Sequence, residues 1–266
     1  MNGQWQGGAD LVTFNGAKEI IKMYLVGLDY LILPVSTDIS DMEEKKNGIL
    51  GFNALRRQMQ SAYECLRTDA PDKVFVLGGG CDADVPVIVY LSEKYQSDLT
   101  VIWLDAHGDL NTPGESGSSL FYGMPLRSVM DNQCFGLLKN RCPLSISQVV
   151  HIGGRDFDEA ESAFIQETRM AAYSVQDIRS DSDLIHRIIE GINSEHIYIH
   201  LDLDVIDPQD FPNTPLPVDN GLFDNEVLDI LTAASGRLAG LGIYEYAPSG
   251  VRNVFVERLI RFGTTL

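Results

Sequence analysis

The chain has 266 residues, of which 38 are acidic and 20 are basic, so its formal net charge is −18 at pH 7. This charge argues against a protein that holds the phosphate backbone of nucleic acid with Lys and Arg. A hydrophobic share of 44% is enough for a large buried core and excludes global disorder.

Short apolar segments alternate with stretches of helical periodicity along most of the chain. The apolar segments predict strands over residues 24–33, 74–77, 99–104, 149–152, 197–201 and 238–244. The periodic stretches predict helices over 51–68, 85–95, 120–131, 159–168, 181–192, 224–235 and 251–262. This alternation predicts one three-layer α/β/α domain over residues 1–266 with a mainly parallel sheet. In such sheets ligands bind beyond the carboxyl ends of the strands.

We expect a cytoplasmic protein with no membrane partner. No apolar stretch reaches the roughly 18–20 residues that cross a bilayer, and the first residues contain neither a basic nor an apolar signal region. The four cysteines (Cys65, Cys81, Cys134 and Cys142) form no CxxC pair, so we expect thiols rather than disulfides.

Potential metal ligands follow two of the predicted strands. Asp105, His107 and Asp109 come after 99–104, and Asp202 and Asp204 come after 197–201. The side-chain period of two in extended chain points the members of each set to one side. Either set alone is equally compatible with a solvated turn. Four carboxylates brought together would repel one another without a cation, so both sets together favour a metal site.

The ligand types predict the metal chemistry. Carboxylates with one imidazole suit hard divalent ions, with manganese favoured by the nitrogen ligand, and four carboxylates balance two such ions. Two divalent ions lower the pKa of a shared water, so the sequence predicts a hydrolytic site.

Three motifs resemble the ureohydrolases, the family of arginases, agmatinases and formiminoglutamases: DAHGD at 105–109, HLDLDVIDP at 200–208 and YEYAP at 244–248. The resemblance extends from about residue 74 to 250 and implies an arginase-like three-layer fold with a binuclear manganese site that hydrolyses a guanidino C–N bond. By matching position, it implies bridging roles for Asp105 and Asp202, terminal ligation by His107, Asp109 and Asp204, and binding of the guanidinium group by Glu245. Asp109 would also orient the attacking hydroxide.

One departure from the family lies after residues 74–77. The family reads GGDH there, with the histidine as a metal ligand, whereas this chain reads Gly78-Gly79-Gly80-Cys81. A thiolate is a softer ligand and shifts the preference from manganese towards zinc or iron. The alternatives are a buried thiol beside a degraded first site, or replacement of the ligand by Asp82 or Asp84.

A second departure is Tyr122, which stands where arginases have a histidine before a GQP or GMP triplet, here Gly123-Met124-Pro125. The family's histidine shuttles protons to the leaving amine. A tyrosine, with an ordinary pKa of about 10, is a poor shuttle at neutral pH, although it can donate a hydrogen bond or stack on a substrate. Slow turnover of arginine, or a substrate with a better leaving group such as an N-hydroxylated guanidine, is therefore expected.

The resemblance also implies a binding site for an amino-acid head group. Asn111 and Ser118 match the positions that hold the α-carboxylate in arginases, and Asp158 and Glu161 match those that hold the α-amino group. Ordinary loop roles, and an N-cap role for Asp158, remain alternatives. His200 precedes Asp202 by two residues and shares its face, so it is a candidate partner of that ligand.

The sequence thus favours a hydrolase that converts arginine or N-hydroxyarginine to urea or hydroxyurea plus ornithine, with two divalent metal ions. A formiminoglutamate or agmatine-type amidine hydrolase, or a non-catalytic binding protein with the same fold, are the alternatives. Members of the family are commonly trimers or hexamers, but this chain lacks the longer tail that helps some arginases associate, so a homo-oligomer and a monomer both remain open.

Overall fold

The computed structural model describes residues 1–266, and its centre is a six-stranded parallel sheet with the order β3-β8-β7-β4-β5-β6. The strands are β3 (Val74–Leu77), β4 (Leu99–Leu104), β5 (Val149–Ile152), β6 (Ala171–Tyr173), β7 (His196–Asp202) and β8 (Leu238–Tyr244). Every residue of β4, β5 and β8 is buried, as expected for a parallel sheet with both faces covered. A separate hairpin pairs β1 (Lys45–Lys46) with β2 (Ile49–Leu50).

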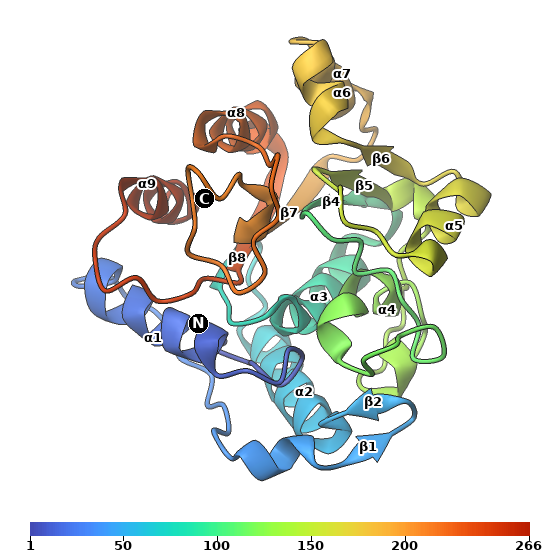
Figure 1. Ribbon diagram of the computed structural model, residues 1–266, viewed down its shortest axis with the longest axis vertical. Coiled ribbons are helices and arrows are strands. Elements are labelled where there is room, and N and C mark those ends of the chain that lie inside the picture. Colours follow the sequence, from blue (N-terminus) through green and yellow to red (C-terminus); the bar gives the residue numbers. More distant parts are fainter.

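Helices cover both faces of the sheet and make a three-layer architecture (Figure 1). On one face, α1 (Val12–Tyr24), α8 (Asp224–Ala234) and α9 (Val254–Gly263) contribute to one apolar cluster, together with α6 (Val175–Ser180) and α7 (Leu184–Gly191). On the other face, α2 (Phe52–Asp69), α3 (Val85–Tyr95) and the short α4 (Pro125–Ser128) contribute to a second cluster, against which α5 (Glu159–Thr168) packs. None of these helices is long and apolar enough to span a bilayer.

Five of the six predicted strands are confirmed, and the strand predicted over 24–33 is wrong. Helix α1 continues to Tyr24, and the chain from 25 to 38 has no regular structure. Gly27 takes a left-handed backbone conformation, with φ of 82°, and Val26 and Leu31 are exposed. The segment meets no strand: Leu33 bonds only to the carbonyl of Met1. An apolar run without a pairing partner gains no ladder hydrogen bonds.

The helix predicted over 120–131 is also wrong. A single 3₁₀ turn covers Phe121–Gly123, and the four-residue α4 follows from Pro125. Proline favours the first turn of a helix and cannot donate within one, so it divides this stretch. The other six predicted helices are confirmed, α3 and α5 at their predicted bounds and the rest with shifts at their ends. No prediction matched α1, α6, β1, β2 or β6.

Candidate metal centre

The candidate ligands lie at the carboxyl ends of four neighbouring strands. The parallel register pairs Leu104 with Leu201 and Asp202 with Tyr244, so the residues that follow these strands meet at one edge. Cys81 follows β3 on a 3₁₀ turn, and Glu245 follows β8 directly. The structure therefore brings all six predicted metal ligands and Glu245 to one region. All of them except the buried Asp105 line a cavity of about 210 Å³, and Tyr122 lines it too.

Three overlapping groups of side chains have ligand atoms within 4.8 Å of one another. They are Asp105, His107 and Asp204; Cys81, Asp202 and Glu245; and Cys81, Asp105 and His200. Within them, the Nδ1 atom of His107 lies 2.9 Å from Oδ2 of Asp204, and Sγ of Cys81 lies 2.9 Å from Oδ2 of Asp202. The three groups overlap through Cys81 and Asp105 and together offer ligands for two ions, as a binuclear centre requires.

The backbone holds the carboxylates in place. Asp105 accepts hydrogen bonds from its own loop, at the amide of His107, and from Nε1 of Trp103 at 2.9 Å. Asp204 accepts from the amide of Ala106 at 3.1 Å, which ties the two acidic loops together. These bonds leave the ligands oriented without the help of a cation.

Without a bound cation, burial and mutual repulsion disfavour the ionised forms of several carboxylates in this cluster. Burial, followed by the charges of neighbouring carboxylates, holds the pKa of Asp109 and that of Asp202 well above their ordinary range, and burial, then Asp82, does the same for Glu245. Although burial opposes it, hydrogen bonds to Asp105 and Asp204 raise the pKa of His107 to about 12. The same imidazole lowers the pKa of Asp105 against the effect of burial.

These residues fit divalent metal ions. Buried carboxylates that are forced towards their neutral forms regain their charge when a cation replaces the protons. Asp109 supplies a direct sign, because its Oδ2 atom is buried and has no hydrogen-bond partner. A metal ligand or the partner of a bound water would have such a free oxygen.

Asp109 and Glu245 also have left-handed backbone conformations, with φ of 54° and 58°. Such values are uncommon for residues other than glycine and persist where the surrounding structure enforces them, often at functional sites. The amide of Glu245 donates to the carbonyl of Gly79, and Oε1 of Glu245 accepts from the amide of Cys81 at 3.1 Å. The carboxylate of Glu245 is thus fixed beside Cys81.

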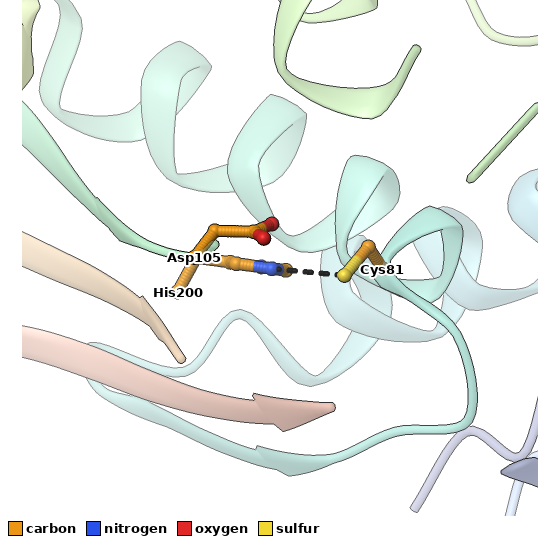
Figure 2. Close-up of side chains that lie close together, drawn as sticks. All are labelled: Cys81, Asp105 and His200. Carbon is orange, nitrogen blue, oxygen red and sulfur yellow. Dashed lines mark hydrogen bonds between the residues drawn. The ribbon is translucent and has the colours of Figure 1, made fainter. Parts of the chain in front are cut away.

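Cys81 is buried and contacts the imidazole of His200, to which the family resemblance assigned no metal-ligand role. Nε2 of His200 lies 3.3 Å from Sγ of Cys81, and Nδ1 of His200 lies 2.7 Å from Oδ2 of Asp84. Figure 2 shows the ring of His200 pointing at the sulfur, with the carboxylate of Asp105 beside it. Burial, followed by the charge of Asp202, raises the pKa of the Cys81 thiol well above its ordinary value.

Asp82 and Asp84, the alternative ligands to Cys81, make other contacts. Asp82 accepts a hydrogen bond from Gln4, and Asp84 accepts from the hydroxyl of Tyr198 and from His200. Cys81 is therefore the residue of this turn that faces the cluster.

The four predicted head-group residues lie together in a second cavity of about 330 Å³. It adjoins the first cavity, since His107, Asp109 and Tyr122 line both. The residues in question are Asn111, Ser118, Asp158 and Glu161.

Two of these residues also have structural roles. Asp158 caps α5 by accepting from the amide of Glu161, and its other oxygen accepts from Nδ2 of Asn111 at 2.6 Å. Glu161 accepts from the amides of Leu110 and Asp158, and burial raises its pKa. The N-cap role of Asp158 is thus confirmed, and the cavity leaves a substrate role open to it as well.

Sequence reasoning missed Arg155, which positions the loop that carries Asp204. Its guanidinium donates to five backbone carbonyls, those of Gly153, Asp204, Val205, Val218 and Asp219. The sequence offered little indication of this role, because the segment around Arg155 pointed only to the acidic residues that follow it as candidates for substrate binding. His200 itself gave a stronger signal, because it lies two residues before Asp202 and shares a strand face with it.

Together, the fold and the cluster define a class: a three-layer α/β protein with a carboxylate-rich binuclear metal site at the carboxyl ends of its strands. The chain belongs to the arginase family, whose sequence pattern matches residues 29–254. Membership of this family implies a binuclear metal site, in agreement with the ligand groups above.

Individual relatives agree with this assignment. The chain is 31% identical to the arginase of Neurospora crassa over 212 residues, which is 73% of this chain and 59% of that protein. It is 31% identical to an arginase of Staphylococcus aureus over 195 residues, which is 70% of this chain and 64% of that protein. The chain thus matches about three fifths of the length of these curated relatives.

Solved structures show the same fold. The arginase of Entamoeba histolytica, solved in complex with L-ornithine, aligns with a TM-score of 0.84 at 18% identity and covers 97% of this chain and 93% of its own. The arginase of Bacillus subtilis aligns with a TM-score of 0.77 at 22% identity, covering 97% and 93%. At these identities the likeness shows the fold alone.

Proposed function

We propose that the protein is a binuclear-metal hydrolase that cleaves the guanidino C–N bond of arginine or N-hydroxyarginine. Water adds its oxygen to the guanidino carbon, and the bond from this carbon to the side-chain nitrogen breaks. The released nitrogen takes up a proton. The products are urea or hydroxyurea and ornithine.

One observation carries this proposal: the metal-ligand cavity and the head-group cavity adjoin through His107, Asp109 and Tyr122. A guanidino amino acid has two polar ends separated by an apolar chain. Its cationic group would lie in the first cavity beside Glu245, and its zwitterionic head would lie in the second. An amidine without a head group would not use the donors that Asn111 and Ser118 offer to a carboxylate in the second cavity, so it should bind less tightly than arginine.

The residues of the first cavity would divide the chemical work. When bound, two divalent ions supply a water of lowered pKa and stabilise negative charge. Asp109 would orient the attacking water with its unpartnered Oδ2. Glu245 would hold the planar guanidinium as an ionised carboxylate. Tyr122 would donate a hydrogen bond to the substrate or stack on it.

The residues of the second cavity would bind the head group. Asn111 donates one amide hydrogen to Asp158 and keeps a second for the α-carboxylate, with Ser118 as a further donor. Asp158 and Glu161 would attract the α-amino group through the lone pairs that their capping contacts leave free.

The expected metal at the oxygen-rich position of Asp105, His107 and Asp204 is manganese, because carboxylates with one imidazole suit it. The position next to Cys81 carries a sulfur ligand and is a separate question. The expected partner is a small guanidino amino acid rather than a macromolecule.

A substrate screen on the full chain tests this proposal. The protein is reconstituted with divalent metal and given arginine, N-hydroxyarginine, agmatine and formiminoglutamate, with ornithine, urea and hydroxyurea as readouts. We expect ornithine from the two amino acids, with faster release from N-hydroxyarginine, and none from an Asp204→Asn control. Preferential turnover of agmatine or formiminoglutamate would replace the proposal with the other amidine hydrolases. Bound metal without turnover of any substrate would favour a non-catalytic member of the family.

A further inference from the structure

His200 is a buried imidazole whose position is fixed on every side. Its ring stacks on Trp103 with centroids 3.4 Å apart and on Tyr244 with centroids 4.6 Å apart. The side chain has no solvent exposure. Its Nε2 atom therefore has one direction open to it, towards Sγ of Cys81 at 3.3 Å (Figure 2).

The contacts of Asp84 define which nitrogen of His200 carries the proton. Asp84 accepts from the hydroxyl of Tyr198 at 2.6 Å and lies 2.7 Å from Nδ1 of His200. A carboxylate only accepts hydrogen bonds, so Nδ1 is the protonated nitrogen. In the neutral ring the lone pair of Nε2 then faces the metal cluster. This carboxylate–histidine arrangement is the one that orients metal-ligating histidines in proteins.

We propose that His200 supplies the imidazole that position 81 lacks, so that Cys81, Asp105 and His200 together hold the first metal ion. The ligand atoms of these three side chains lie within 4.8 Å of one another. A tetrahedral ion with bonds of about 2.3 Å to sulfur and about 2.0 Å to nitrogen places those two atoms about 3.5 Å apart. The observed 3.3 Å between Sγ and Nε2 is close to this spacing. The inference rests on the binuclear site of the proposed function and specifies its ligands.

The ligand set also predicts the identity of the ion. One thiolate, one imidazole and one carboxylate form a mixed and softer set than the oxygen-rich group of His107, so the first position should select zinc over manganese. The other buried histidine near the site, His151, is not a candidate for this role, because it belongs to none of the three ligand groups and its Nε2 atom lies 2.7 Å from the carbonyl oxygen of His107.

Metal binding to the full chain tests the inference without any substrate. Elemental analysis and competitive chelator titration give the number of ions and their affinities. Substitution with cobalt(II) adds a spectroscopic signature, because a thiolate ligand produces a charge-transfer band in the near ultraviolet. The variants are His200→Asn, Asp84→Asn and Cys81→Ser. His196→Asn is the matched control, because His196 lies on the same strand and pairs with Asp98 through Nδ1, but at the opposite end of the sheet.

In the natural protein we expect two ions per chain and a thiolate band. His200→Asn should bind one ion per chain and show no thiolate band. Asp84→Asn should weaken the first site roughly 10- to 100-fold, as loss of the partner of a ligating histidine does. Cys81→Ser should lose the band, and His196→Asn should match the natural protein. Two ions of unchanged affinity and an unchanged band in His200→Asn would overturn the proposal and leave His200 as a hydrogen-bond partner of Cys81.

Because His200 is buried, a second variant guards against a folding defect. The double variant Cys81→His/His200→Ser keeps one imidazole at the first position but moves it to the turn after β3. We expect this double variant to bind two ions, to prefer manganese and to show no thiolate band. Failure to recover the ion lost in His200→Asn would count against the proposal. The outcome is separable from catalysis: a His200-dependent metal site in a protein that hydrolyses no guanidino acid would sustain this inference and remove the proposed function.

Discussion

Tyr122 lies where the two cavities meet, and the family resemblance places it where arginases have a histidine, so its role can be tested by exchange. It lines both cavities beside Asp109. A histidine there titrates near neutrality and can pass a proton to the leaving amine, which is typically worth 10²- to 10⁴-fold in rate. We expect Tyr122→His to raise kcat/KM for arginine by roughly tenfold or more, measured as ornithine formation.

Tyr122→Phe is the matched variant, because it removes the hydroxyl and keeps the ring. If the hydroxyl donates to the substrate, this variant should lose activity on both arginine and N-hydroxyarginine. Unchanged or reduced turnover of arginine by Tyr122→His would show that proton delivery to the amine does not limit this enzyme.

Asp82 is a buried carboxyl that makes the protein less stable at neutral pH. Burial raises its pKa from 3.8 to about 6, and its Oδ1 atom has no partner. The folded chain therefore binds this proton more tightly than the unfolded chain, and stability falls as the pH rises from about 4 to about 6. In chelator-treated protein, Asp82→Asn should be more stable than the natural chain at pH 7 by about 3 kcal/mol, and equal to it near pH 4.

Urea denaturation at the two pH values measures this difference. Asp72→Asn is the control, since Asp72 is exposed and pairs with Lys94 at the surface, and it should gain no stability at pH 7. Equal pH dependence in Asp82→Asn and the natural chain would mean that Asp82 is ionised in the folded state.

At the scale of elements, the sequence predicted those parts of the fold that depend on local pattern. The strands β3, β4, β5 and β8 match their predicted bounds because each is a continuous apolar run between polar turns. The segment 24–33 is a similar apolar run, but a strand also needs a neighbouring strand with which to pair. The sequence of a segment does not specify which strand, if any, will pair with it. The predicted 120–131 helix failed at Pro125, a breaker that was visible in the sequence.

The same distinction applies to the site. Asp105, His107, Asp202 and Asp204 could be predicted because each pair follows one strand at a spacing of two. The contact between Asp84 and His200 joins the turn after β3 to the middle of β7 and depends on the packing of α3 and β7 around it. Spacing along the chain carries no information on such a contact.

Arg155 shows how one side chain fixes the loops that carry ligands. All five N–H groups of its guanidinium donate to backbone carbonyls, including that of Asp204. Lysine has three donors, so Arg155→Lys leaves at least two of these carbonyls without a partner. We expect it to lower the free energy of unfolding by about 2–4 kcal/mol and to weaken metal binding at Asp204.

Chemical denaturation and metal titration check this prediction. Arg187→Lys is the matched control, because Arg187 makes only a surface ion pair with Asp181, and its replacement should change neither quantity. Metal affinity at the level of the natural chain in Arg155→Lys would show that the loop keeps its shape without the guanidinium.

At the scale of the whole molecule, part of the acidic excess lies in the buried carboxylates of the candidate metal site. Two divalent ions add four charges, which would bring the formal net charge from −18 to −14. The carboxylates that they neutralise are buried at one edge of the sheet, where repulsion costs far more than at the surface. Metal binding should therefore affect the stability of the entire fold.

Removal of metal tests this coupling through its pH dependence. In the metal-free chain the pKa values of Asp109, Asp202 and Glu245 lie well above their ordinary range, first because of burial. The folded metal-free chain therefore binds more protons than the unfolded chain, and its stability falls as the pH rises from about 4 through these values. Metal binding requires the deprotonated ligands, so its contribution grows over the same range. When the free concentration of an ion is about 100 times its dissociation constant, that ion raises the free energy of unfolding by about 2.7 kcal/mol. Two such ions should raise Tm by an amount on the order of 10 °C.

Calorimetry with and without chelator at pH 5, 7 and 8.5 measures this rise, and we expect it to increase with each step in pH. Asp202→Asn is the control variant, because it removes a carboxylate that contacts Cys81 and should abolish most of the metal-dependent rise. A rise that is the same at all three pH values would mean that protons do not compete with metal for these carboxylates. That result would place the ions outside the buried cluster, because ligands at the surface would be ionised across the whole range.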